Sequence, residues 1–176
     1  MGAPPALVFA ARWPERVRRL VVMNSLLVWD EATSWEIRLL RRFQWNRVLL
    51  RRAGRLVFTR AVWTSLPART RLPAALREEL WTSFRRPEVR AFVAKMCAGY
   101  QGTLPDLMEI YPQVAAPTLL LWGERDRHFP VGHGRRLAAM LPAAEIQTVR
   151  GGQHWMGWHR APEVSQAIAA FLRRSA

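Results

Sequence analysis

The chain has little cysteine, tyrosine and lysine, and it has no long apolar run. Its single cysteine, Cys97, excludes an internal disulfide and favours a reducing compartment, so we expect a cytoplasmic protein. No apolar run reaches the roughly 18–20 residues that span a membrane, and no basic stretch precedes the first apolar residues as in a signal peptide. Spacings typical of zinc sites, phosphate loops and RNA-binding aromatic motifs are missing. We therefore expect no metal, no cofactor and no nucleic acid partner.

Arginine is the residue that the chain has in excess. Lysine occurs once, at Lys95, whereas the formal net charge is +14. Eight arginines fall between Arg38 and Arg60, and apolar residues such as Leu39 and Val48 alternate with them. This pattern is typical of a helix with a solvated basic face. The alternative is a surface that binds phosphates, an acidic partner or anionic lipid.

Strand patterns and helix patterns alternate at both ends of the chain. The predicted strands cover 17–23, 118–122 and 145–149, and the predicted helices cover 3–13, 35–53, 73–84, 88–97, 131–140 and 162–173. The strands are short apolar runs, typical of strands that are buried on both faces. The alternation predicts an α/β fold with a parallel sheet and crossover helices, and the helical middle is interpreted as an insertion.

Three motifs, in this order and spacing, resemble the α/β-hydrolase family, particularly its members with a helical cap. ARWPERVRRLVVMNS (11–25) is similar to the helix after the nucleophile elbow and the strand that comes next. LLLWGERDRHFP (119–130) is similar to the strand and loop of the catalytic acid, and GGQHWMGWHRAPEV (151–164) to the histidine loop. The resemblance implies a partial parallel sheet at 1–28 and 115–176, with an inserted all-helical cap at 29–114.

Asp126 and His154 are the candidate catalytic pair. Each follows a predicted strand, so both loops should meet at the carboxyl edge of the sheet, where ligand sites of such folds collect. A carboxylate there can orient an imidazole, whose other nitrogen then serves as general base. The order nucleophile, Asp, His is the one that the family uses.

Other titratable residues near these motifs are weaker candidates. Glu124 is the alternative candidate for the acid, and His159 is the alternative candidate for the base. Gln153 stands where the family usually has glycine before the histidine, so the alignment of the histidine motif stays open. We expect His128 and His133 to face solvent. Cys97 is expected to be a small buried residue.

The resemblance also predicts what the first residues are. Met1 and Gly2 match the last two positions of G-x-S-x-G, the nucleophile elbow, so the nucleophile itself should lie upstream. Met1 would then occupy the oxyanion-hole position that follows the nucleophile. We therefore expect an N-terminal truncation and an inactive chain.

The substrate is less well defined by the sequence. Methionine after the nucleophile is common in ester-cleaving relatives, which favours a serine hydrolase of a small molecule. Epoxide hydrolases use cap tyrosines; the chain has two tyrosines, Tyr100 and Tyr111, and Tyr100, which lies late in the cap, is expected to pack. Haloalkane dehalogenases have tryptophan at the place of Met1. Both remain alternatives, as does a non-catalytic remnant that binds an acidic partner or membrane through its Arg-rich helix; the oligomeric state stays open.

Overall fold

A three-stranded parallel sheet is the centre of the molecule, as the computed structural model shows; it describes residues 2–174 without the Phe43 side chain. The strands β1 (Leu20–Met23), β2 (Thr118–Gly123) and β3 (Ala144–Val149) lie in the order β1–β2–β3. Leu120 of β2 pairs with Val22 of β1 on one side and with Ile146 of β3 on the other. The predicted α/β class with a parallel sheet is therefore confirmed.

Helices occupy most of the remaining chain. In chain order they are α1 (Ala3–Arg12), α2 (Trp35–Leu40), α3 (Phe43–Arg52), α4 (Gly54–Ser65), α5 (Ala74–Phe84), α6 (Pro87–Ile110), α7 (Val131–Met140), α8 (Met156–His159) and α9 (Ala161–Arg173), with short 3-10 turns at Pro14–Arg16 and Tyr111–Gln113. None of these described helices is long and apolar enough to cross a membrane.

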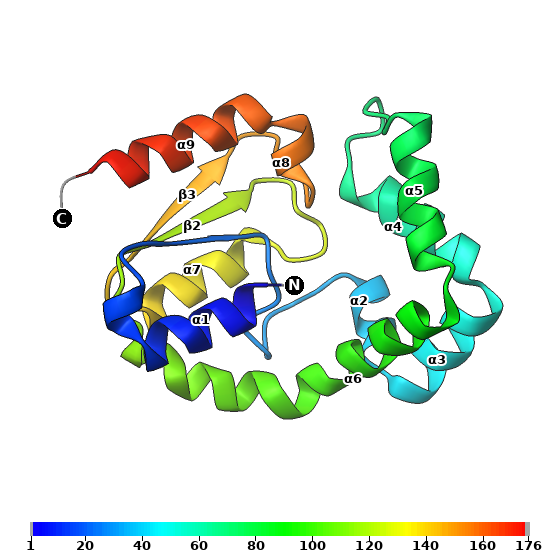
Figure 1. Ribbon diagram of the computed structural model, residues 1–176, viewed down its shortest axis with the longest axis horizontal. Coiled ribbons are helices and arrows are strands. Elements are labelled where there is room, and N and C mark those ends of the chain that lie inside the picture. Colours follow the sequence, from blue (N-terminus) through cyan, green and yellow to red (C-terminus); the bar gives the residue numbers. More distant parts are fainter. Residues whose placement is uncertain (1, 175–176) are drawn as a thin grey trace.

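The two faces of the sheet bury different side chains. Successive residues of a strand point to opposite faces, so Leu120 packs with α1 and α7 whereas Leu119 and Leu121 pack with α9. Figure 1 shows α1 and α7 on one side of the strands and α9 on the other. All six residues of β2 are buried, as expected for a central parallel strand. This layering presents the carboxyl ends of the strands to the helices that follow β1.

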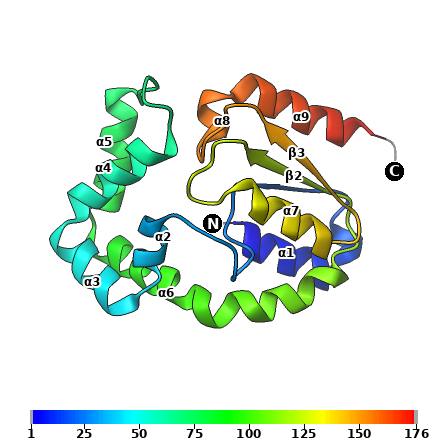
Figure 2. The ribbon, with the colours of Figure 1, turned by 180° about the vertical axis from the view of Figure 1, so that it is seen from behind.

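Five helices, α2 to α6, stand between β1 and β2, and α4 and α5 lie apart from the sheet (Figures 1 and 2). The predicted helix 35–53 is split, because Arg42 is extended between α2 and α3. The predicted helix 88–97 was too short: α6 continues through Pro105 to Ile110. Its second half buries Leu104 fully and packs Leu107 against the core, and this tertiary burial outweighs the weak helix propensity of the intervening glycines and proline.

Gly123 ends β2 where the chain after β3 crosses it. A Cβ at this position would lie 2.6 Å from the Gly152 carbonyl oxygen, closer than any van der Waals contact.

We expect Gly123→Ala to lower the free energy of unfolding by about 1–3 kcal/mol, since backbone must move on both sides. Gly99→Ala is the matched control: the site in α6 is exposed and open, so alanine should stabilise by about 0.5–1 kcal/mol. Urea unfolding followed by circular dichroism measures both, and equal stability of Gly123→Ala and wild type would contradict the expectation.

Candidate active site

Three loops meet at the carboxyl edge of the sheet, one after each strand. They begin at Asn24, Glu124 and Arg150, and ligand sites of open α/β sheets form at this edge. Polar side chains from these loops contact one another directly, as described below.

Asn24 joins the three loops through its side chain amide. Its Oδ1 accepts the backbone N–H of Gly123 at 2.8 Å, and its Nδ2 donates to the carbonyl oxygens of Gln153 (3.0 Å) and His154 (2.9 Å). Asn24 is buried, and its φ of 37° lies in the left-handed region that asparagine tolerates better than most residues. In the sequence Asn24 is only the residue that follows the predicted strand 17–23. A short polar residue directly after a buried strand was the signal that could have identified it.

The carboxylate of Asp126 is buried next to His154. Its Oδ2 is 2.9 Å from Nδ1 of His154, and the side chain of Asp126 has no exposed surface. Its Oδ1 accepts the backbone N–H groups of His128 (2.8 Å) and Phe129 (3.1 Å). The structure thus brings the two predicted residues together, with both carboxylate oxygens hydrogen-bonded; their catalytic role stays a prediction.

The two rival residues have other partners. Glu124 accepts the backbone N–H of Gly151 at 2.8 Å and is exposed. His159 accepts the N–H of Gln153 at its Nε2 (3.2 Å) and therefore donates from Nδ1 to the Trp155 carbonyl (3.0 Å). Both nitrogens of His159 are used within its own loop, so the geometry favours His154 as the base.

The prediction that His128 and His133 face solvent was wrong. Their exposed fractions are 5% and 1%. His133 donates from Nε2 to the Ala32 carbonyl at 2.9 Å, and burial lowers the pKa of both imidazoles. The cause is long-range: the segment after β1 folds over the 124–130 loop, which local sequence patterns cannot show.

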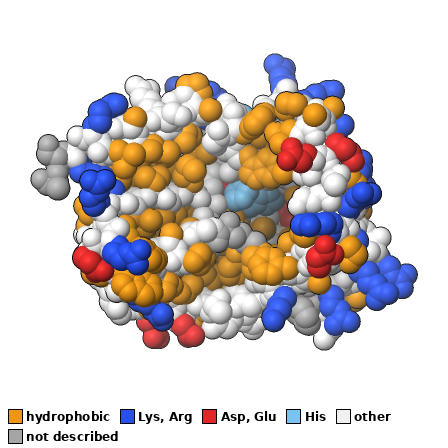
Figure 3. Space-filling view, viewed as in Figure 1, with side chains coloured by type: hydrophobic (Ala, Val, Ile, Leu, Met, Phe, Trp, Pro, Cys, Tyr) orange, Lys and Arg blue, Asp and Glu red, His pale blue; other side chains and the backbone are white. Residues whose placement is uncertain are grey.

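Two hollows border His154, whose side chain is 22% exposed. One is a cavity of about 220 Å³ whose lining includes Asn24, Arg41 and Phe129. The other is a cleft of about 500 Å³, lined mainly by apolar side chains of α2, α3 and α4. Its two charged residues, Glu36 and Arg60, pair with each other at 2.8 Å. Figure 3 shows histidine surface at the floor of a hollow with apolar side chains around it.

The remaining candidates have roles in packing. Burial raises the pKa of the Cys97 thiol to about 11, so at neutral pH it is protonated and a poor nucleophile. Tyr111 is fully buried and donates its hydroxyl to the Leu27 carbonyl at 2.8 Å. Tyr100 lines the smaller cavity, and burial raises its pKa to about 12.

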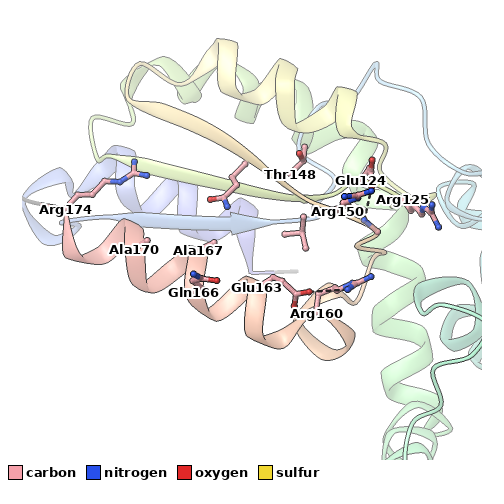
Figure 4. A pocket seen from close by; sticks show the side chains of 13 residues that line it. Glu124, Arg125, Thr148, Arg150, Arg160, Glu163, Gln166, Ala167, Ala170 and Arg174 are labelled. Atoms are coloured by element: carbon pink, nitrogen blue, oxygen red, sulfur yellow. Dashed lines mark hydrogen bonds and ion pairs between the residues drawn. The ribbon is translucent and has the colours of Figure 1, made fainter.

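A larger hollow of about 980 Å³ lies between β3 and α9, away from this pair (Figure 4). Among its charged side chains, Arg160 pairs with Glu163 at 3.1 Å, and Glu124 holds the Gly151 N–H. Neither Asp126 nor His154 is among its described lining residues. Within the described residues, no group of three or more His, Cys, Asp or Glu is placed to hold a metal ion. Met1, the predicted oxyanion-hole position, lies outside the described residues.

Comparison with known proteins identifies the family. The profile of the α/β hydrolase fold matches residues 1–161. A 2-hydroxy-6-oxononadienedioate/2-hydroxy-6-oxononatrienedioate hydrolase of Klebsiella pneumoniae is 29% identical over 99% of this chain and 60% of its own length. The chain belongs to the α/β hydrolase family, and it spans about 60% of the length of the curated relatives it matches.

Solved structures agree with this assignment. A membrane phospholipase A, described as a bacterial virulence factor, superposes with a TM-score of 0.76 and 27% identity, over 96% of this chain and 53% of that one. The 2-hydroxy-6-oxo-6-phenylhexa-2,4-dienoate hydrolase of Rhodococcus sp. strain RHA1 gives a TM-score of 0.75 at 19% identity, over 99% and 62% of the two chains. The latter likeness concerns the fold alone.

The bond between Asp126 and His154 can be tested by substituting the carboxylate. Asp126→Asn keeps an oxygen for the N–H groups of His128 and Phe129 but presents an amide N–H to His154, so the imidazole should change tautomer. We expect the downfield proton resonance of a hydrogen-bonded imidazole N–H to disappear from the NMR spectrum. Glu124→Gln is the control and should retain it.

Asp126→Ala is expected to be less stable than Asp126→Asn by about 1–3 kcal/mol, because it leaves two buried N–H groups without an acceptor. Urea unfolding measures the difference. Loss of the resonance in Glu124→Gln, with retention in Asp126→Asn, would reverse the assignment of the acid.

Proposed function

We propose that Asp126 and His154 are the acid and base of a hydrolase that attacks a carbonyl carbon, with an ester as the first choice of substrate. The 2.9 Å contact between Asp126 and Nδ1 of His154 carries this proposal. It leaves Nε2 free to take a proton from a serine hydroxyl and later to give it to the leaving group. The relative from Klebsiella pneumoniae is named for a 6-oxo compound. Such a compound, like an ester, offers a carbonyl carbon to a nucleophile.

The apolar cleft supports a small-molecule substrate with an apolar substituent. We propose that residues 29–114 form a cap whose helices α2 to α4 supply most of this lining, and that 1–28 and 115–176 form the core that holds the catalytic pair. Among the described lining residues the charged ones are Glu36 and Arg60, which pair with each other. A charged group at this end of a substrate would therefore lack a partner and would have to lose its hydration, which is costly.

The nucleophile is proposed to be a serine directly before Met1 in the parent protein. In this family one oxyanion-hole N–H belongs to the residue after the nucleophile, and the other to a loop that follows an earlier strand. A chain that begins at Met1 would have neither the attacking oxygen nor the second donor.

We expect the chain expressed alone to hydrolyse a nitrophenyl ester no faster than buffer, because the serine that we propose for His154 to activate would lie before Met1. Release of nitrophenol, measured by absorbance, tests this. Turnover that is robust and is abolished by both Asp126→Ala and His154→Ala would refute the missing nucleophile. A folded sample, shown by circular dichroism, is the necessary control.

The codons upstream of Met1 give an independent test. A reading frame that ends in Gly-x-Ser before Met1 would support the serine hydrolase. Gly-x-Asp would instead support the alternatives, an epoxide hydrolase or a haloalkane dehalogenase. An in-frame stop codon at this place would contradict an upstream nucleophile.

A second candidate function rests on the outer face of α3. Trp45 and Val48 are 66% and 57% exposed, and beside them lie Arg47 and Arg51, which form no ion pair within the part of the chain that the structure describes. From residue 37 to residue 77 the chain has eleven arginines and no acidic residue. Lys and Arg side chains gather at this end of the molecule (Figure 3). Exposed tryptophan among unpaired arginines favours binding to an anionic membrane surface.

Vesicle binding tests this second candidate. We expect binding to phosphatidylcholine vesicles that contain about 30% phosphatidylglycerol, and a loss of roughly tenfold or more in Arg47→Glu/Arg51→Glu. The control, Arg135→Glu/Arg150→Glu, makes the same charge change on exposed core positions and should retain most binding. Equal losses in the two variants would indicate attraction by net charge alone and contradict a site on α3.

A further inference from the structure

His128 contacts the core and the helical segment at once. Its backbone N–H is bound by Asp126, and its carbonyl accepts the backbone N–H of Ser34 at 3.3 Å. Its ring nitrogens contact two hydroxyls from different elements: Nδ1 is 2.9 Å from Oγ of Ser34, the residue before α2, and Nε2 is 2.9 Å from Oγ1 of Thr64 in α4. One buried side chain therefore connects the acid loop to both α2 and α4.

The hydrogen bonds define the protonation of this imidazole. The Thr64 hydroxyl donates to the Arg60 carbonyl at 2.8 Å, so it accepts a hydrogen from Nε2 of His128. Nδ1 then accepts the hydroxyl proton of Ser34. Every donor has an acceptor when His128 is neutral. Burial lowers the pKa of His128 and so favours this neutral form at pH 7.

The end of α4 is also attached to the histidine loop. The backbone N–H of Trp155 donates to the carbonyl of Ser65 at 3.0 Å, next to Thr64. The ring of His128 stands edge-on to that of His154, with centroids 5.3 Å apart. The residues of these contacts also line the apolar cleft: Thr64, Ser65, His128, His154 and Trp155. The position of α4 relative to His154 therefore sets the width of the cleft.

We propose that neutral His128 is a positioning residue that holds Ser34 and Thr64 against the acid loop and thereby fixes the apolar cleft beside His154. We call this arrangement the His128 clamp. It depends on the proposed function only in taking the cleft as the substrate site.

Acid should weaken the His128 clamp. The charged or titratable groups around the ring are Asp126 and Glu36, which favour its protonation, and His154 and Arg127, which oppose it together with burial. The unfolded chain binds a proton at the ordinary pKa of 6.5, whereas the folded chain resists it, so the folded contact loses stability as the pH falls below about 6.5. Protonation also turns Nδ1 into a donor, and the Ser34 hydroxyl must then reorient.

Hydrogen exchange read by mass spectrometry tests the clamp in the full chain. Peptides from α2 and the last turn of α4 are followed at about pH 7.5 and 5.5, with correction for intrinsic exchange. We expect exchange in wild type to accelerate on acidification. In His128→Phe, which keeps a ring but loses both hydrogen bonds, exchange at the higher pH should already be roughly tenfold faster or more, and its further acceleration on acidification should be smaller than in wild type.

Two further variants make the test specific. Tyr111→Phe removes one buried hydrogen bond in the core, far from α4 in the contact network, and should leave exchange in α2 and α4 unchanged. Ser34→Ala/Thr64→Val removes the two partners and keeps His128; it should reproduce His128→Phe and carries the test if that variant does not fold. Wild-type protection in His128→Phe or in Ser34→Ala/Thr64→Val would overturn the proposal, as would an acid effect as large in His128→Phe as in wild type. Hydrogen exchange does not require turnover. The exchange result therefore tests the His128 clamp whether or not the esterase assay supports the proposed function.

Discussion

The buried carboxylate of Asp126 is the group on which the rest of the site depends. A charge without exposed surface is tolerated only when its oxygens are hydrogen-bonded, and Asp126 has two backbone N–H groups on one oxygen and His154 on the other. Those donors come from its own loop and from the loop after β3. Satisfying one carboxylate therefore fixes two loops, and Asn24 adds the third loop by holding the N–H of Gly123 and the carbonyl of His154.

The predictions that succeeded depended on local patterns. The apolar runs that became β2 and β3 are short and bounded by turns, and they identified the parallel sheet within a residue or two at each end. The proximity of Asp126 to His154 followed from topology, since loops after neighbouring parallel strands share one edge. The catalytic roles of these two residues came from the family resemblance. The observed geometry is compatible with those roles, but it is no test of catalysis.

The predictions that failed depended on contacts between distant segments. His128 and His133 are buried because the chain around Ala32 and Ser34 covers them, nearly a hundred residues away in sequence. The length of α6 was likewise decided by burial of Leu104 against the core rather than by local propensity. Asn24 was missed for the same reason, because its partners lie on the other two loops.

The continuity of α6 has a consequence for how this architecture can change. Its 24 residues extend about 36 Å, and the same helix contacts both α3 and α1. Its middle lines the smaller cavity through Cys97 and Tyr100, and its last turns pack Leu107 and Met108 against the core on one face of the sheet. An insertion of one residue within it would rotate one half by about 100° relative to the other. We therefore expect changes in chain length to be tolerated better in the loops between α2 and α5 than within α6.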